Sequence, residues 1–376
     1  MSALLLLLAG FQGGCEDAVS YYHLYLSQHQ MKDGSWGGRP AGCTCPHPPD
    51  PPAVAADPEL VRGWVAQLGD DDPERRDAAE GRLRSLVEAA LPALKEAAAH
   101  SDPEVRTRCE RIRVGIVTRS RGAGVVETTG LAILAFMGAG YSHLSKDTYE
   151  GICFGEVVRN GLRWLLARQD ASGRFDAQDP VANAVAALAV SEAYGLTGST
   201  LWKEAAQRGV KAAESAEVFG PRALAWTALV AASARLSELE GSHAERASAI
   251  VEALQEFPSL LATAVRAHVR LVFSKEKSAA VADELARTVP ADLDPEIRLF
   301  VAGAFYGLEG PTGPLWREWG PRVKDALVPR QRVKRDGCER GSWAADDVNG
   351  RLRATALNGL ALQIYYRYWN QFFMTK

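Results

Sequence analysis

A pattern of glutamine, glycine and an aromatic residue occurs three times and constrains the fold of this chain more than any other feature. The copies are Gln30, Gly34 and Trp36; Gln169, Gly173 and Phe175; and, with a longer spacing, Gln331, Gly341 and Trp343. A tight turn would explain an Asp-Gly pair alone, because glycine tolerates a positive φ. It would not explain the recurring aromatic residue, so the triplet indicates a repeated structural unit.

Amphipathic segments precede the first two copies. The sequences "CEDAVSYYHLYLSQHQ" and "GEVVRNGLRWLLARQ" repeat their apolar residues with the period of an α-helix. Residues 201–239 have the length of a further helix pair but end without the triplet. The chain contains no convincing run of alternating β-branched residues. The sequence therefore predicts an all-α fold whose repeat is partly eroded.

A second type of sequence interrupts this pattern after the first copy. The proline-rich residues 43–59 predict an extended linker. The following block is charged outside and rich in Leu and Ala inside, and Asp57-Pro58, Asp72-Pro73 and Asp102-Pro103 are typical helix starts. Two or three helices joined by an "LPAL" turn are predicted here, similar to HEAT-type units. The inward-facing leucines of this prediction are Leu83, Leu86, Leu91 and Leu94.

Composition limits the classes of partner. The 376 residues are 47% hydrophobic and 24% charged, with a formal net charge of −3, so nothing draws the chain generally to nucleic acid or anionic membranes. The apolar start "SALLLLLAGF" is too short for a spanning helix and has no basic flank. It is interpreted as a helix end or loop of a cytoplasmic protein. The alternative is a remnant of a longer N-terminal region that attaches the protein to a membrane complex.

Several stretches together resemble the terpenoid cyclase and protein prenyltransferase superfamily of α/α toroids. The chain is most similar to bacterial proteins that carry prenyltransferase and squalene-oxidase repeats. The resemblance rests on "HQMKDGSWGG", "AILAFMGAGYSH", "VVRNGLRWLLARQDASGRFD", "ALAVSEAYGLTGS" and "RDGCERGSW" with "TALNGLALQIYYRY". It covers residues 16–53 and 116–370, although residues 205–325 follow it mainly through helix spacing.

The resemblance implies two concentric rings of helices around a central cavity. Residues 1–53 and 116–376 would form this toroid, with Tyr141 and His143 as candidates to line the cavity, and residues 54–115 would be a HEAT-like insertion. The triplets would then connect helix pairs: the glycine turns the chain, the aromatic ring packs, and the glutamine amide reaches backbone groups exposed at a helix end. This interpretation makes the triplets structural rather than catalytic.

The residues that could carry chemistry are few. Terpene cyclases of the protonating class use an Asp-x-Asp-Asp motif, which this sequence lacks. Asp346 and Asp347 follow Trp343 and form either an acid or cation site at the cavity mouth, or a surface turn. No complete zinc-ligand set of the prenyltransferase type maps onto the chain. Three other residues, within "CTCPH", form a partial metal site with poor spacing and no fourth ligand: Cys43, Cys45 and His47.

Two functional hypotheses follow. The first is a non-catalytic binding or scaffold protein without a cofactor, with a protein partner on the toroid or the inserted block and no role in nucleic-acid binding. The second is an enzyme that handles isoprenoids, similar to a cyclase or prenyltransferase, or a lipid-binding protein. It would hold its isoprenoid or lipid ligand in an apolar central cavity.

Overall fold

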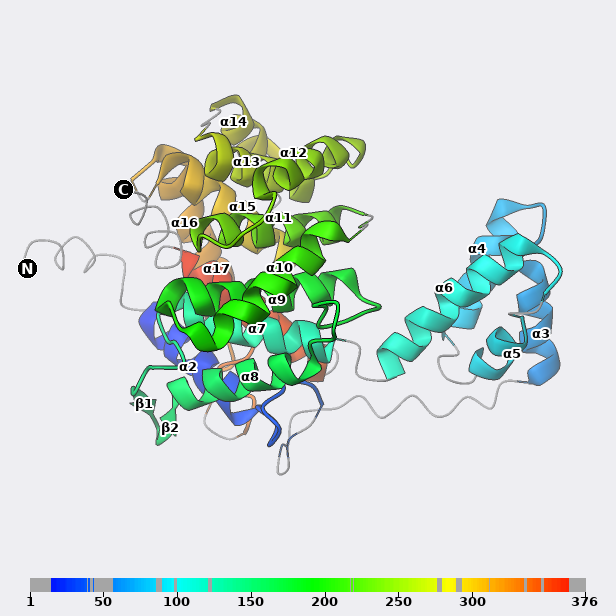
Figure 1. Cartoon of the computed structure of the whole chain (residues 1–376), viewed down its shortest axis with the longest axis horizontal. Coiled ribbons are helices and arrows are strands. Elements are labelled where there is room, and N and C mark those ends of the chain that lie inside the picture. Colours follow the sequence, from blue (N-terminus) through cyan, green and yellow to red (C-terminus); the bar gives the residue numbers. More distant parts are fainter. Residues whose placement is uncertain are drawn as a thin grey trace, which may run out of the picture. The chain divides into compact units, whose positions relative to one another are not determined.

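The chain was analysed as a computed structural model. It describes all residues except 1–14, 39, 41–42, 44–56, 86–89, 98–99, 121–123, 217, 219, 276–278, 289–292, 311, 335–336, 346–347 and 365–376. Only the backbone is described for residues 15–17, 84–85, 91, 111, 113–120, 279–280, 288 and 348. Figure 1 shows the arrangement of the elements. The described part is predominantly helical, which confirms the all-α prediction. Its strands are the short antiparallel pair β1 (Thr148–Tyr149) and β2 (Ile152–Cys153).

Two compact units divide the chain: Met1–Pro46 with Val125–Lys376, and His47–Gly124. The sequence predicts the start of the smaller unit after residue 53, which is later than observed. It predicts the end of that unit after residue 115, which is earlier than observed. The second boundary moves because the last helix of the smaller unit continues to Ser120. The chain then reaches the Gly122-Ala123-Gly124 segment, which is a poor helix former.

Six inner helices of the larger unit each pack against the next, and the last packs against the first. They are α7 (Val125–Gly138), α9 (Pro180–Thr197), α11 (Pro221–Leu236), α13 (Leu260–Ser274), α15 (Pro295–Glu309) and α17 (Val348–Leu362). Their composition explains this position. In α9 every residue from Val181 to Ala193 is buried, and a helix that is apolar all round must be covered on all sides. The inner helices therefore form a closed ring.

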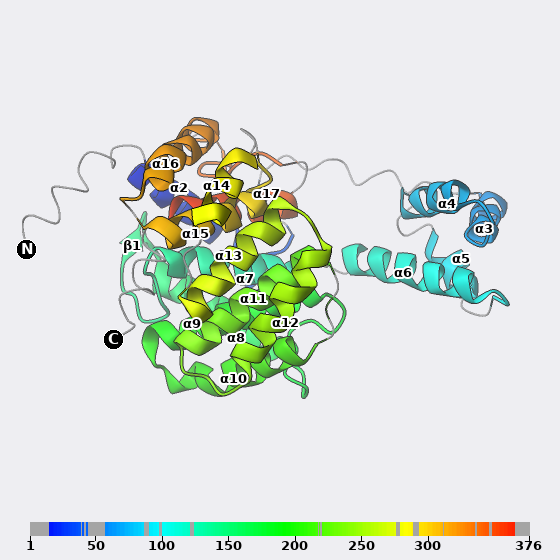
Figure 2. The same ribbon diagram turned by 90° about the horizontal axis from the view of Figure 1, so that it is seen from above.

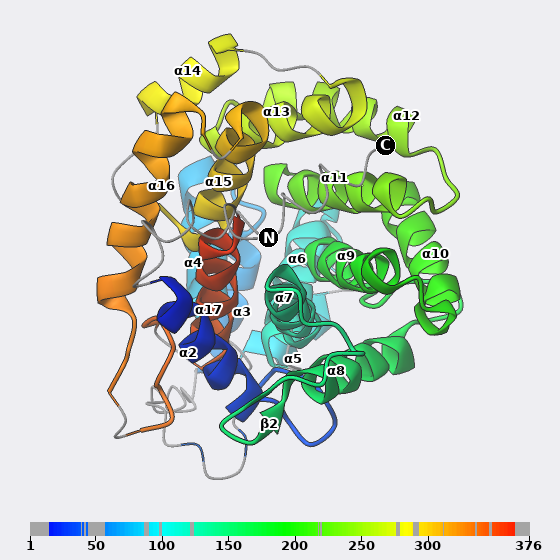
Figure 3. The same cartoon turned by 90° about the vertical axis from the view of Figure 1, so that its left-hand side faces the viewer.

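Six outer helices surround the ring, as Figure 3 shows. They are α2 (Cys15–Gln28), α8 (Phe154–Arg168), α10 (Thr200–Ser215), α12 (His243–Ala253), α14 (Ala279–Thr288) and α16 (Pro314–Leu327). Short 3₁₀ turns follow α12 and α16, at η3 (Leu254–Glu256) and η4 (Val328–Arg330). Each outer helix packs on two neighbouring inner helices, so α2 bridges α7 and α17, which are the first and last of the ring. Outer and inner helices alternate along the chain.

Each triplet lies between an outer helix and the inner helix that follows it, and each glutamine makes the same two hydrogen bonds. Gln30 Nε2 donates to the Gly34 carbonyl at 3.0 Å and to Val157 of the next outer helix at 2.9 Å. The second glutamine repeats this with Gly173 and Ala205, at 3.0 and 2.9 Å. The third does so with Gly341 and Ala18, both at 2.9 Å. Its second acceptor belongs to α2, so the third copy joins the last outer helix to the first.

The glycines of the triplets are required by close approach as well as by conformation. Gly34 has φ +96°, and a Cβ there would lie 2.4 Å from the Asn160 carbonyl oxygen. At Gly173 and Gly341 the same clash would involve the carbonyls of Arg208 and Tyr21. In all three copies, the carbonyl that would clash belongs to the residue three positions after the helix residue whose carbonyl accepts from the glutamine. The turn can therefore pack directly on the next outer helix only if the residue at the glycine position has no side chain.

The aromatic residues of the triplets are buried between the layers. Trp36, Phe175 and Trp343 expose at most 4% of their surface. The Trp36 backbone N–H donates to Thr129 of α7, and its indole N–H donates to the Leu26 carbonyl at 2.6 Å. The indole of Trp343 similarly donates to the Leu327 carbonyl at 2.8 Å. Each of these rings thus ties the end of its outer helix to the inner layer.

The smaller unit contains four described helices, seen in Figures 1 and 2. They are α3 (Pro58–Gln67), α4 (Pro73–Ser85), α5 (Leu91–Glu96) and α6 (Pro103–Ser120). The predicted starts are confirmed, since Asp57, Asp72 and Asp102 each accept a hydrogen bond from the backbone N–H two residues later. The "LPAL" segment is helical rather than a turn, because Pro92 lies in the first turn of α5, where no intrahelical N–H bond is lost.

Two stacked hairpins make up this unit. Helices α3 and α4 pack together, as do α5 and α6, and α3 contacts α5 while α4 contacts α6. The hairpins share a feature at their turns: Arg76 donates to the carbonyls of Asp70 and Asp71, and Arg106 repeats this thirty residues later with His100 and Ser101. Of the leucines predicted to face inward, Leu83 and Leu94 are buried. Leu86 and the side chain of Leu91 lie outside the described residues.

We expect Gly34→Ala to destabilise the protein more than Gly38→Ala. Both glycines have positive φ, +96° and +92°, but a Cβ at Gly38 would meet nothing within 4 Å. Gly38→Ala should therefore cost about 1–2 kcal/mol for backbone conformation alone. Gly34→Ala adds the clash with Asn160, for a total of about 2–5 kcal/mol. Chemical unfolding monitored by circular dichroism measures both; equal losses would show that the close approach is unimportant.

We also expect the larger unit to fold without the smaller one. The two have separate buried clusters, and a Cβ at Gly37 would lie 2.3 Å from the side chain of Val125. Gly37, shortly before the smaller unit, therefore lies against Val125, the first residue after that unit. Replacing residues 47–124 by a short Gly/Ser linker should leave a cooperative thermal transition. Aggregation, or a loss of helicity larger than the deleted share, would contradict this.

Candidate functional site

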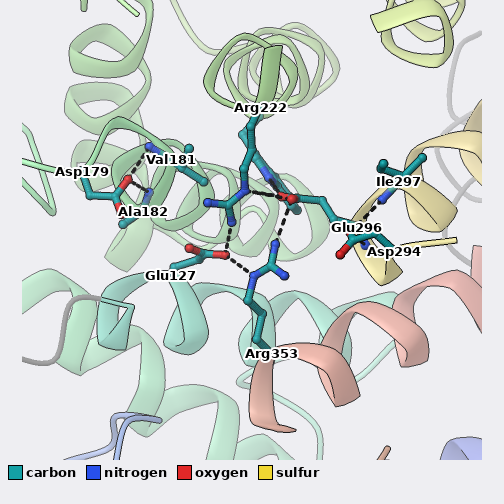
Figure 4. Close-up of polar contacts among 10 residues, drawn as sticks. Glu127, Asp179, Val181, Ala182, Arg222, Asp294, Glu296, Ile297 and Arg353 are labelled. Atoms are coloured by element: carbon teal, nitrogen blue, oxygen red, sulfur yellow. Dashed lines mark hydrogen bonds and ion pairs between the residues drawn. The ribbon is translucent and has the colours of Figure 1, made fainter. Parts of the chain in front are cut away.

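Four charged side chains from four inner helices meet at one end of the ring, as Figure 4 shows. They are Glu127 of α7, Arg222 of α11, Glu296 of α15 and Arg353 of α17. We call these four residues the charge cluster. Glu127, Arg222 and Glu296 lie in the first turn of their helices and Arg353 in the second turn. These four helices therefore begin at the same end of the ring and run parallel.

The charges alternate, and each arginine contacts both glutamates. Arg353 donates from Nε to Glu127 at 2.7 Å and from Nη2 to Glu296 at 2.8 Å. Arg222 donates from Nε to both carboxylate oxygens of Glu296, at 3.0 and 2.8 Å, and from Nη2 to Glu127. The indole N–H of Trp226 also donates to Glu296. Two positive and two negative charges thus compensate one another.

The electrostatics of the cluster follow from its partial burial. The side chains of both glutamates are 8% exposed, whereas those of Arg222 and Arg353 are 38% and 27% exposed. Burial alone would lower the pKa of Arg222, but Glu127 and Glu296 more than offset this, so its pKa is raised. Arg222 therefore stays charged, and both arginines hold the glutamates as hydrogen-bond acceptors. As arranged, both carboxylates are bound as ion-pair partners of the two arginines.

Capping residues organise the same end of the ring. Asp179 accepts hydrogen bonds from Val181 and Ala182 at the start of α9, and Asp294 accepts from Glu296 and Ile297 at the start of α15 (Figure 4). These caps satisfy N–H groups that have no partner within the helix. The Asp294 cap thereby holds the first turn of α15 in place, and with it the side chain of Glu296.

None of the four charged residues was identified from the sequence. A signal was present, since Glu127 is the only charged residue of α7, and Glu296 and Arg222 follow the prolines that begin two apolar helices. A charge in a helix buried all round requires a compensating partner. The identity of the partner was not visible, because the four residues are spread over more than two hundred positions.

The sequence-predicted acid and metal candidates are only partly described. Asp346 and Asp347 lie outside the described residues, as do Cys45 and His47. Cys43 is described and buried, and its neighbours are His29 and Cys338 rather than residues close in sequence.

Tyr141 and His143, predicted to line a cavity, lie in the loop after α7. His143 is buried, and the indole nitrogen of Trp202, on outer helix α10, lies 3.1 Å from its Nδ1. Burial, with a smaller contribution from Arg159, lowers the pKa of His143. Burial raises the pKa of Tyr141, and Asp147 adds to the effect. Both residues pack within the protein, and His143 faces the outer layer.

His23 is a buried titratable residue that the sequence did not single out. Its ring lies in an aromatic pocket with Phe136, Tyr141 and Phe154, at centroid distances of 4.8, 5.3 and 5.6 Å. Its Nε2 lies 3.1 Å from the Ala135 carbonyl oxygen. Burial lowers the pKa of His23 to about 4, so the ring is neutral near pH 7. In this state it supports packing between α2 and α7.

In comparisons with known proteins, no family, curated protein or solved structure matches this chain. Among the helices of the described residues, none has the combination of length and apolar character that crossing a bilayer requires.

We expect Glu296→Gln to destabilise the protein, because it leaves Arg222 and Arg353 with one carboxylate between them. Breaking a buried ion pair costs about 3–5 kcal/mol, and the partial exposure of both arginines places the expected loss near the lower end, about 3 kcal/mol. Glu318→Gln is the matched control, since its pair with Arg322 is exposed and should contribute less than about 1 kcal/mol.

The free energy of unfolding from denaturant titration measures this difference. Similar small losses for Glu296→Gln and Glu318→Gln would show that the charge cluster adds no stability.

Proposed function

We propose that this protein is a non-catalytic α/α toroid that binds a protein partner, and that it is similar in architecture to the terpenoid cyclase and prenyltransferase superfamily. The main support is the charge cluster. Four inner helices place their charged side chains against one another at one end of the ring, where a catalyst of this superfamily would need groups available to a substrate.

The chemistry of the cluster argues against acid catalysis. A cyclase of the protonating class requires a carboxylic acid that stays protonated in an apolar site. Glu127 and Glu296 instead each accept hydrogen bonds from two arginines, so neither carboxyl group stands alone in an apolar site. The sequence also lacks the Asp-x-Asp-Asp motif. The arrangement fits a structural role at the end of the ring better than a role in proton transfer.

The smaller unit supports the binding half of the proposal. Its stacked hairpins resemble HEAT-type units, which typically use a side of such a stack to bind proteins. Charged residues dominate α4, where Glu74, Arg75 and Asp77 of "PERRDAAEGRLRS" are exposed. Leu60 of α3 is 52% exposed. The proposal places the partner on these exposed groups, whose charges suit the polar rim of an interface.

The test is binding by the whole chain and by the chain in which a Gly/Ser linker replaces residues 47–124. A partner captured by the whole chain should bind the purified protein directly and should lose most of its affinity on deletion. Glu318→Gln should bind as the parent does. Retention of full affinity by the deleted protein would remove the argument for the smaller unit.

The competing hypothesis is an isoprenoid-handling enzyme, and it has its own assay. The purified protein is incubated with polyprenyl diphosphates and with squalene, and products are sought by mass spectrometry. We expect none. Product formation that is lost in Glu127→Gln or Glu296→Gln, or in the double variant Asp346→Asn with Asp347→Asn, would overturn the non-catalytic proposal.

A further inference from the structure

Three potential metal ligands from distant parts of the chain meet beside the first and third triplets. They are His29, next to the end of α2, Cys43, after the first triplet, and Cys338, inside the third. One ligand atom of each lies within 4.8 Å of the other two. We propose that His29, Cys43 and Cys338 bind a zinc ion, and that this ion fastens the first outer helix to the loop that follows the last one.

The distances fit one tetrahedral ion. The Cys43 Sγ lies 3.4 Å from His29 Nε2 and 3.5 Å from the Cys338 Sγ. Zinc–sulfur bonds of about 2.3 Å and zinc–nitrogen bonds of about 2.0 Å in a tetrahedron separate neighbouring ligand atoms by roughly 3.5–3.8 Å. The two separations from Cys43 are therefore within a few tenths of an ångström of these values, and the separation between His29 and Cys338 is within 4.8 Å. The sulfur atoms are too far apart for a disulfide, whose bond length is about 2.05 Å.

The imidazole of His29 is oriented as a ligand. Its Nδ1 lies 2.8 Å from the Tyr25 carbonyl oxygen, so the proton belongs on Nδ1 and the Nε2 lone pair faces the sulfur of Cys43. A backbone carbonyl that fixes the tautomer in this way is a common feature of zinc-binding histidines.

The unusual spacing of the third triplet provides a further argument. Nine residues separate Gln331 from Gly341, whereas three separate Gln30 from Gly34. The extra length is not needed for the triplet itself, because Gln331 makes the same two hydrogen bonds as the other glutamines. What the longer segment adds is a loop that presents Cys338 to His29 and Cys43.

Ion pairs hold in position the two residues that follow the cysteine. Glu339 lies 3.5 Å from Arg332 and 3.6 Å from Arg351. Arg340 pairs with Glu150 at 2.9 Å, and its guanidinium lies over the ring of Tyr21 at 4.6 Å. The sulfur of Cys338 is thus supported by its surroundings, as expected for a preformed site.

The site differs from the partial site predicted from the sequence. That prediction combined Cys43 with Cys45 and His47, which lie outside the described residues. Within the described part of the chain, His29 and Cys338 join Cys43 in a set of two sulfurs and one imidazole, donors typical of zinc, and a water molecule would take the fourth tetrahedral position. The inference is independent of the proposed binding function.

The test uses the full chain, purified without a metal-chelating tag. Elemental analysis should find about one zinc per chain. After removal of zinc, Co²⁺ should bind stoichiometrically and give the thiolate-to-cobalt charge-transfer absorption of a site with cysteine ligands. Added Zn²⁺ should displace the cobalt and raise the melting temperature of the metal-free protein.

Cys338→Ser, Cys43→Ser and His29→Ala should each weaken Zn²⁺ affinity at least about a hundredfold. Cys153→Ser and Cys109→Ser are the controls, since neither residue belongs to the cluster, and they should bind as the parent does. Circular dichroism shows whether each variant is folded. For variants that do not fold, alkylation of the parent provides a second readout: Zn²⁺ should protect Cys43 and Cys338, but not Cys153.

Three results would overturn the proposal. The first is a parent protein that binds neither metal ion and gains no thermal stability from Zn²⁺. The second is cobalt absorption that persists unchanged in Cys338→Ser. The third is a parent whose intact mass and peptide map show a disulfide between Cys43 and Cys338 instead of a metal ion.

Discussion

The paired hydrogen bonds of a glutamine amide are the interaction on which the double ring of helices most depends. Each of the three glutamines binds the carbonyl of its own turn and a carbonyl in the first turns of the next outer helix. Outer helices are amphipathic and touch the ring along one face, so burial alone leaves their position along the ring poorly specified. The amide fixes that position, because both of its N–H groups must be satisfied at once.

The glycine and the aromatic residue are consequences of that geometry. If the glutamine is to reach both carbonyls, the turn must lie against the next helix, and any side chain at Gly34 would meet Asn160. The Trp36 ring then fills the space between the two layers, and a Cβ at Gly161 would lie 2.8 Å from it. The second copy repeats this arrangement with Phe175 and Gly209. One set of contacts thus accounts for residue choices in the turns and in two separate helices, α8 and α10.

Sequence reasoning recovered what is local and repeated. It found the triplets, the all-α class and the helix starts at Asp57, Asp72 and Asp102, because capping and helical periodicity are properties of neighbouring residues. It misread "LPAL", where proline is compatible with the first helical turn. It had no access to the charge cluster or to the contact of Cys43 with Cys338. Those depend on the closure of the ring, which brings together residues that no local spacing relates.

The position of α2 has a consequence for the order of folding. This helix is the first described element of the chain, yet it packs on α17, the last. Synthesis from the N-terminus presents α2 long before its partner exists, while α3–α6 can already fold around their own core. Closing such a long loop is entropically costly and is favoured only when the intervening helices are in place. Ring closure is therefore a late step, and a nascent chain must shield the apolar face of α2 until synthesis is nearly complete.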